Sequence, residues 1–142
     1  QTLSKAYGMA GLRIGIGAAS TEIATLINTI KGPYNVNSLS QKIALEQLSD
    51  EKVFKENLEQ ILAERELLKV QLNQLDFVKK IYPTEANFFL IKVENPIEIY
   101  EFLLAQNILT SLRHPQIENA LRINVGSKEE NQKLIETLKN YQ

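Results

Sequence analysis

A long apolar stripe is the feature that most restricts what this chain can fold into. Between residues 54 and 75, apolar side chains recur at alternating steps of four and three, which places them on one face of a helix. The stripe consists of Phe54, Leu58, Ile61, Leu68, Leu72 and Leu75, with Arg65 as its interruption. It covers only about three heptads, which favours a helix that packs against a core over a coiled coil. We therefore expect a long helix with one buried face.

After this helix the spacing of apolar residues along the sequence changes, and the new spacing indicates strands. NFFLIKV, at residues 87–93, is rich in residues that favour strands, and ALRINV, at residues 120–125, has apolar side chains at alternate positions. Asn95-Pro96-Ile97-Glu98 predicts a helix that runs to about Gln106, and a capping box at residues 127–130 opens a last helix. With a short strand near Ile108 and Leu109, the expected order is strand, helix, strand, strand, helix, which is an α/β unit.

The first fifty residues give a different pattern. Residues 12–19, LRIGIGAA, form an apolar run with two glycines, which predicts a buried strand that another group approaches closely. Ser20 is the expected N-cap of a helix that ends at residues 31–33, Lys-Gly-Pro. SLSQ, at residues 38–41, has the form of a capping box, and the helix that it opens is expected to end near Leu48.

Composition argues against several classes of protein. The 142 residues carry a formal net charge of -1, whereas a dedicated nucleic-acid binder normally has a basic surplus. The chain has no cysteine, so a disulfide, a thiolate metal site and a cysteine nucleophile are all excluded. No apolar run approaches the length of a membrane span and no signal peptide is visible, so we expect a cytoplasmic protein without membrane contact. His114, the single histidine, stands beside a proline in a polar loop, and we expect no metal site.

The opening segment TLSKAYGMAGLR gathers groups suited to a phosphorylated carbonyl compound. A lysine amine forms a Schiff base with a carbonyl when desolvation or a neighbouring cation keeps it neutral, and Lys5 lies among short and flexible neighbours. Thr2 and Ser4 offer hydroxyl groups, and the planar Arg13 guanidinium can donate two hydrogen bonds to one phosphate group. Pyridoxal phosphate is the common compound of this kind. The residues alone also allow a second interpretation, in which Lys5 and Arg13 are solvated charges on a loop and a strand edge.

The segment TLSKAYGMAGLRIG closely resembles the cofactor-lysine segment of fold-type I aminotransferases that depend on pyridoxal 5'-phosphate, in particular the histidinol-phosphate aminotransferase family. The resemblance implies that Lys5 is the catalytic lysine and that it binds the cofactor covalently. It also implies that Thr2 and Ser4 contribute hydroxyl groups on the phosphate side, and that Arg13 is the arginine that binds the phosphate.

Two later segments extend the resemblance along the chain. PYNVNSLSQ resembles the loop and helix start that follow in this family, and LRINVGSKEENQKLI resembles its C-terminal segment. By this match Arg122 is the residue expected to clamp the α-carboxylate of an amino acid substrate. The strand pattern agrees, because Leu121, Ile123 and Val125 share one face and Arg122 then points to the other.

One loop departs from the family pattern. Family members usually have another arginine before the last strand, where it helps to bind the phosphate or carboxylate of the substrate. In this chain Thr110 or Ser111 occupies the aligned position, and Arg113 lies only nine residues before Arg122. Arg113 is therefore a candidate substrate-binding residue through a rearranged loop, and exposure of its side chain to solvent is the alternative.

The resemblance implies an α/β fold, the C-terminal part of a fold-type I aminotransferase. We expect the tail of a large cofactor-binding domain at residues 1–50, a connecting helix at residues 51–75 and a small C-terminal α/β domain at residues 76–142. The implied reaction converts histidinol phosphate and 2-oxoglutarate to imidazole acetol phosphate and glutamate, in a protein that is a homodimer when full-length. Because the residues that complete the site would precede Gln1, we expect little or no transaminase activity from these 142 residues alone.

Three other interpretations stay open at this point. Another aminotransferase, for aromatic amino acids, or a phosphothreonine decarboxylase shares much of the pattern. LRIGIGAASTEIATLINTI can be read as the strand, G-x-G-x-x-S turn and helix of a dinucleotide-binding site, but no acidic residue for the ribose occurs between Glu22 and Glu46. A non-catalytic α/β interaction module is the third interpretation.

Overall fold

The computed structural model describes residues 1–141, and these form two compact units that divide within one long helix. The first unit is Gln1–Leu58, and the second begins at Glu59. Each unit has a cluster of buried apolar side chains of its own. The three-part division that the sequence predicts, with boundaries at residues 50 and 75, stays a prediction.

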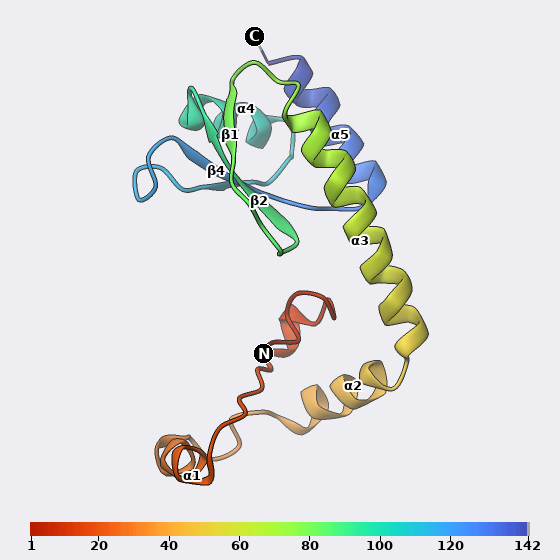
Figure 1. Cartoon of the computed structure of the whole chain (residues 1–142), viewed down its shortest axis with the longest axis vertical. Coiled ribbons are helices and arrows are strands. Elements are labelled where there is room, and N and C mark those ends of the chain that lie inside the picture. Colours follow the sequence, from red (N-terminus) through yellow and green to blue (C-terminus); the bar gives the residue numbers. More distant parts are fainter. Residues whose placement is uncertain (142) are drawn as a thin grey trace. The chain divides into compact units, whose positions relative to one another are not determined.

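The second unit is built on a four-stranded antiparallel sheet (Figure 1). Its strands are β1 (Val78–Ile81), β2 (Phe88–Val93), β3 (Ser111–Leu112) and β4 (Ala120–Asn124). They lie in the order β1-β2-β4-β3, so β2 and β4 form the centre of the sheet. Burial alternates from residue to residue along β2, which is the pattern of a sheet with one face in a core.

Helices from three places in the chain complete this core. They are α3 (Glu51–Leu72), α4 (Pro96–Ala105) and α5 (Lys128–Lys139), and α5 runs beside the later part of α3 (Figure 1). The buried side chains of the core come from strands and helices alike: Phe89, Ile91, Val93, Leu121 and Ile123, and Leu68, Leu72, Ile99, Leu103, Leu134, Ile135 and Leu138. The opposite face of the sheet contributes none of these side chains.

The α/β prediction is confirmed, with two corrections to its strands. The sequence analysis missed β1, because a β-bulge between Val78 and Lys80 interrupts the two-residue alternation and its two lysines are exposed. The short strand expected near residues 108–109 lies instead at Ser111–Leu112. The amide of Ile108 donates to the carbonyl of Leu103 at 2.9 Å, so Ile108 closes the end of α4 and strand pairing starts later.

The first unit contains the short 3₁₀-helix η1 (Ala10–Leu12), the helices α1 (Thr21–Ile30) and α2 (Ser38–Leu48), and the start of α3. The buried strand predicted at residues 12–19 is wrong. Only Gly15 of this run forms a bridge, with Thr2, and Ile16 is half exposed. A strand needs a neighbour along its whole length to bond its backbone groups, and within the described residues only residues 14–16 of this run lie beside one, which is residues 1–3.

Helix starts were predicted more accurately, because their signal is local. The Ser20 hydroxyl accepts a hydrogen bond from the amide of Ile23, and Ser127 and Glu130 form the expected capping box of α5. The capping box predicted at residues 38–41 is wrong by one residue. Asn37 is the N-cap of α2, since its backbone is extended and its side-chain oxygen accepts from the amide of Ser40 at 2.8 Å.

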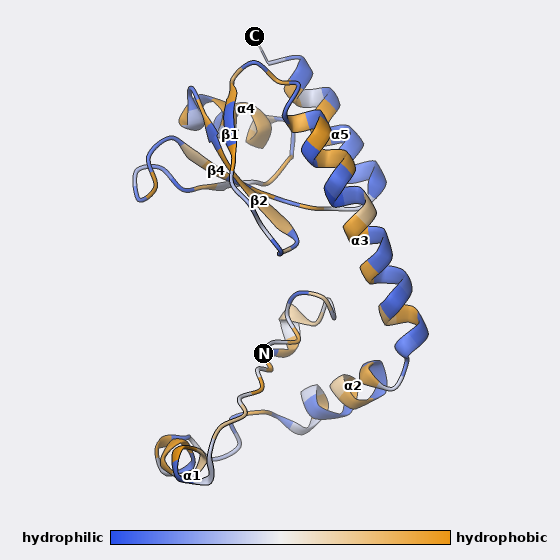
Figure 2. Cartoon of the chain, in the orientation of Figure 1, coloured by the Kyte–Doolittle hydropathy of each residue, from blue (hydrophilic) through white to orange (hydrophobic). Residues whose placement is uncertain are grey.

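The apolar residues of α1 share one face, as their spacing predicts, but none of them is buried (Figure 2). Ile23, Leu26 and Ile27 are each at least half exposed, and Ile30 is 84% exposed. Among the helices of residues 1–141, none combines the length and the apolarity that a membrane crossing requires.

Two adjacent leucines of α3 test the position of the core. Leu68 is fully buried, whereas Leu67 is 58% exposed on the other side of the same turn. We expect Leu68→Ala to lower the free energy of unfolding by about 3 kcal/mol, because it leaves a cavity in the core. Leu67→Ala is the matched control and should cost less than about 1 kcal/mol. Urea unfolding measures both values, and equal losses would contradict the assigned core.

Candidate functional site

The N-terminal segment folds into a closed loop that brings residues 2–4 beside residues 13–15. Thr2 bridges Gly15, and the amide of Leu3 donates to the carbonyl of Ile14 at 3.3 Å. Leu3 and Met9 are buried in the small apolar cluster of this unit. The loop is therefore anchored by its apolar side chains, and its polar side chains lie on the outside.

Two hydroxyl groups and a guanidinium lie on this loop. The Thr2 hydroxyl donates to the Ser4 hydroxyl at 2.9 Å and accepts from the Ser4 amide at 3.1 Å. Arg13 has a left-handed backbone, with φ of 57°, and its Nη1 donates to the carbonyl of Ala10 at 3.1 Å. A left-handed arginine is a locally strained residue, and such strain persists where the surroundings fix it, often at functional sites.

The chemistry of this donor set fits a phosphate group. Hydroxyl groups and a guanidinium are the donors that bind phosphate oxygens, and Thr2, Ser4 and Arg13 supply both kinds on one short loop. Lys5 is exposed directly after Ser4. The turn that follows needs Gly8, which has a φ of 66° and donates its amide to the Lys5 carbonyl at 2.9 Å. The loop thus places an amine next to candidate phosphate ligands.

Arg122 lies on the second unit, on the face of the sheet opposite the core. Leu121 and Ile123 are fully buried, so the predicted orientation of Arg122 is confirmed. Its guanidinium carbon lies 4.8 Å from the centre of the Phe88 ring. Its Nε is buried and has no hydrogen-bond partner among the described residues. An unpaired buried donor of this kind is costly, which points to a ligand that accepts from it.

Phe88 is a residue of this site that the sequence analysis did not single out. A guanidinium over an aromatic ring is attracted to the ring face, and its N–H groups remain available at the edge of its plane. The signal for Phe88 was present in NFFLIKV, because Phe89 is in the core and the residue before it must face the other way.

Arg113 directly follows β3, the edge strand beside Arg122. Ser111 is directly opposite Arg122 in the register of β3 and β4, and the Arg113 amide donates to the carbonyl of Ala120 at 3.0 Å. Because side chains alternate along a strand, Ser111 points to the Arg122 face while Leu112 packs on the core. Arg113 is half-buried, and its role in substrate binding stays a prediction.

Thr110, the other residue that the sequence analysis considered at the aligned position, does not pair with β4. It lines a cleft of about 570 Å³ beside the end of β4, together with Asn124 and Lys133. Its hydroxyl is buried without a hydrogen-bond partner among residues 1–141.

His114 belongs to the loop that joins β3 to β4. Its Nδ1 accepts a hydrogen bond from the amide of Asn119 at 3.3 Å, which supports the loop. No three His, Cys, Asp or Glu side chains within the described part of the chain are grouped as metal ligands would be.

The turn that follows β4 is held by a buried side-chain network. Asn131 accepts from the Gly126 amide at 2.9 Å and donates to the Gly126 carbonyl at 3.1 Å. The same amide group donates to Oε2 of Glu64 on α3 at 2.9 Å, and both residues are buried. Asn131 therefore fixes the end of the strand that carries Arg122 against α3 and α5.

Comparison with known proteins shows what this chain is similar to. Residues 1–138 match the family of class I and II aminotransferases. A histidinol-phosphate aminotransferase of Flavobacterium psychrophilum is 48% identical over 98% of this chain and 40% of its own length. The chain thus spans about two fifths of the length of the curated relatives that it matches.

Solved structures of related proteins share this fold. The histidinol-phosphate aminotransferase of Clostridium acetobutylicum matches 96% of this chain and 43% of its own, with a TM-score of 0.87 and 29% identity. The L-threonine-O-3-phosphate decarboxylase of Porphyromonas gingivalis matches 98% of this chain and 44% of its own, with a TM-score of 0.77 and 26% identity.

Removal of the Asn131 side chain tests the role of the buried network that joins Asn131 to Gly126 and Glu64. Asn131→Ala leaves the Gly126 amide and the buried Glu64 carboxylate without their partner, so we expect a loss of about 1–3 kcal/mol in the free energy of unfolding. Gln132→Ala, one residue along the same helix, removes only an exposed bond to Glu136 and is the control. A loss no larger than that of the control in urea unfolding would show that the network does not hold the turn.

Proposed function

Because this chain belongs to the family of class I and II aminotransferases, we propose that it carries the cofactor lysine and the substrate-binding arginine of a pyridoxal-phosphate-dependent aminotransferase. The observation that carries the proposal is the joint placement of Thr2, Ser4 and Arg13 around one loop, with Lys5 next to them. The proposed reaction converts histidinol phosphate and 2-oxoglutarate to imidazole acetol phosphate and glutamate, and relatives up to 48% identical are named histidinol-phosphate aminotransferases.

Pyridoxal 5'-phosphate suits the donor set of the N-terminal loop. Thr2 and Ser4 would bind its phosphate through their hydroxyl groups, and Arg13 would pair with the phosphate charge. The cofactor, when bound, supplies a carbonyl that takes up amines and a ring that withdraws electrons from the substrate Cα. The rest of the reaction depends on side chains of the protein.

Lys5 and Arg122 have separate tasks in this proposal. The Lys5 amine would hold the cofactor through its carbonyl group, and as a free amine it would move a proton to and from the substrate Cα. Arg122 binds the substrate carboxylate through N–H groups at the edge of a guanidinium that stacks on Phe88. Small-molecule amino acids and 2-oxo acids are the partners, and we further propose a cytoplasmic homodimer for the full-length protein.

A phosphothreonine decarboxylase is the second candidate, since a solved enzyme of that kind shares the fold and is 26% identical. The two activities differ in product: the decarboxylase releases carbon dioxide, and the aminotransferase produces glutamate. An amino-donor panel that includes an aromatic amino acid also tests whether the protein is instead an aminotransferase for aromatic amino acids.

The dinucleotide interpretation is disfavoured, because Gly15 pairs with Thr2 and does not end a strand.

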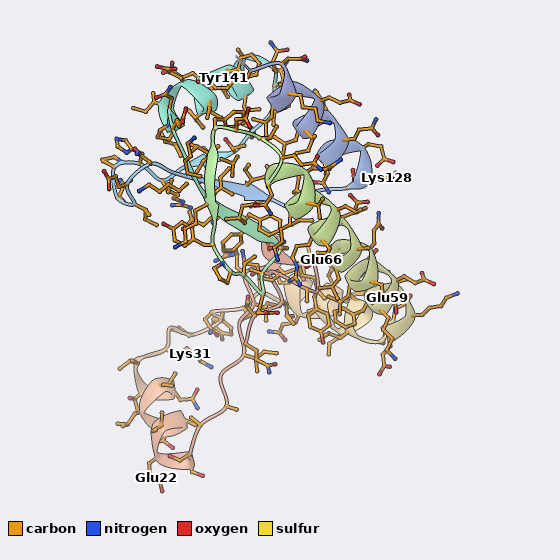
Figure 3. The ribbon with its side chains drawn as sticks, turned by 45° about the horizontal axis from the view of Figure 1, so that its top comes forward. Glu22, Lys31, Glu59, Glu66, Lys128 and Tyr141 are labelled. Atoms are coloured by element: carbon orange, nitrogen blue, oxygen red, sulfur yellow. The ribbon has the colours of Figure 1, made fainter. Side chains whose placement is uncertain are left out.

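Covalent labelling tests the central assignment. The protein produced from the complete reading frame is incubated with pyridoxal phosphate, reduced with borohydride and digested, and the labelled peptide is identified by mass spectrometry. We expect the label on Lys5, and we expect Lys5→Ala to lose both the label and the conversion of 2-oxoglutarate to glutamate, by at least about 10³-fold. Lys31→Ala, at an exposed lysine of the same unit (Figure 3), should keep both. A label at any other residue would refute the assignment.

The aromatic support of Arg122 makes a second prediction. Phe88→Leu keeps an apolar side chain at the position but removes the ring face, so we expect the KM for glutamate to rise about five-fold with little change in kcat. Phe88→Tyr retains the ring and serves as the control. An unchanged KM in Phe88→Leu, or an equal rise in both variants, would contradict this role.

A further inference from the structure

The chain turns sharply after Lys5, and the turn is fixed at its base. The Gly8 amide donates to the Lys5 carbonyl at 2.9 Å, which closes a β-turn. The Met9 amide donates to the Leu3 carbonyl at 2.9 Å and so closes the chain around this turn. Leu3 and Met9 are buried, so the turn projects from a packed base. The direction of Lys5 relative to that base depends on what holds the turn.

Tyr7, the third residue of this turn, stacks on Phe54 of α3. The two ring centres are 4.4 Å apart, and the ring planes are inclined by 20°. Stacked rings at this distance attract each other beyond the burial of their surface. Both residues belong to the first unit. The contact thus ties the turn that carries Lys5 to the first turns of α3.

The start of α3 is a fixed support for this stack. Asp50 caps the helix, since its Oδ1 accepts from the Val53 amide at 3.2 Å and its carbonyl accepts from the Phe54 amide at 3.3 Å. The turn and the helix start line one hollow of about 20 Å³, to which Tyr7 and Phe54 both contribute. The hollow has room for about one water molecule, so the turn lies close against the helix.

Phe54 has no other structural task that its apolar ring would explain. The sequence analysis placed it in the apolar stripe of α3, whose later members Leu68 and Leu72 are buried in the core of the second unit. Phe54 itself is only half-buried, and it belongs to neither apolar cluster of the described residues. Core packing therefore does not account for an aromatic side chain at this position, whereas the stack with Tyr7 does.

We propose that the stack of Tyr7 on Phe54 positions the Lys5 amine for its reaction with the cofactor carbonyl, which makes Tyr7 and Phe54 positioning residues. This reaction joins the Lys5 nitrogen to the aldehyde carbon of pyridoxal phosphate and releases the aldehyde oxygen as water. A turn held on a helix presents the amine in a narrower range of directions than a free turn, which raises its effective concentration at that carbon. The inference rests on the proposed function, because it takes Lys5 as the residue that binds the cofactor.

Two forms of the cofactor separate the position of Lys5 from the phosphate ligands. Pyridoxal phosphate carries an aldehyde that bonds to an amine, whereas pyridoxine phosphate carries an alcohol that does not, and both have the same phosphate group. Equilibrium titration of the cofactor-free protein from the complete reading frame measures both dissociation constants. We expect Phe54→Leu and Tyr7→Leu each to weaken pyridoxal phosphate binding about fivefold and to leave pyridoxine phosphate binding within about twofold.

Matched variants show whether the ring contact is the cause. Phe54→Tyr keeps the ring and should bind both compounds within about twofold of the parent protein. Phe54→Leu combined with Tyr7→Leu should weaken pyridoxal phosphate binding about as much as either single variant, because each alone already removes the stack. Leu45→Ala removes an exposed apolar side chain of the same unit and should change neither constant. Equal weakening of both compounds in Phe54→Leu, weakening of neither, or additive losses in the double variant would overturn the positioning role.

Lys5→Ala distinguishes the failure of this inference from the failure of the proposed function. The proposed function requires Lys5→Ala to weaken pyridoxal phosphate binding and to leave pyridoxine phosphate binding nearly unchanged. If it does so while Phe54→Leu has no effect, the positioning role is overturned and the proposed function stands. If Lys5→Ala binds both compounds as the parent protein does, the proposed function is overturned, and the positioning role with it.

Discussion

The pairing of β2 with β4 is the constraint on which the second unit depends. Five residue pairs, from Phe88 opposite Asn124 to Lys92 opposite Ala120, fix the register of these strands. The core requires Leu121 and Ile123 to face the helices, so the two-residue period turns Arg122 away from them. A slip by one residue would bury the arginine and expose both apolar side chains. The same packing that stabilises the fold therefore sets the direction of Arg122, the candidate substrate-binding residue.

The N-terminal loop obtains its geometry in another way. Its shape depends on the buried side chains of Leu3 and Met9 and on backbone bonds between residues 1–3 and 14–16. Two residues, Gly8 and Arg13, have positive φ values, so local conformation as well as packing brings the polar groups together. For a site that must hold a phosphate, a loop closed on itself by apolar anchors presents its donors before any ligand arrives.

The parts that could be predicted from the sequence are those with short-range causes. Alternation along β4 was sufficient to orient Arg122, and the hydroxyl of Ser127 was sufficient to mark the start of α5. Features that depend on a neighbour were harder to predict. β1 exists because β2 offers it a partner, whereas within residues 1–141 the run at 12–19 has only the short segment 1–3 beside it and forms no strand. Phe88 escaped notice for a related reason, since its role appears only once the register places its ring beside Arg122.

The register also limits which residues of the unusual loop before β4 can lie beside Arg122. Of the two residues aligned with the arginine of the resembled family, Ser111 lies on the Arg122 face, whereas Thr110 precedes the pairing. An arginine moved by one residue from Ser111 would replace Leu112 and point into the core. Arg113 follows the last paired residue of β3, so strand pairing no longer dictates the direction of its side chain. A cation before β4 is therefore compatible with the core at Ser111 or beyond Leu112, but not at Leu112 itself.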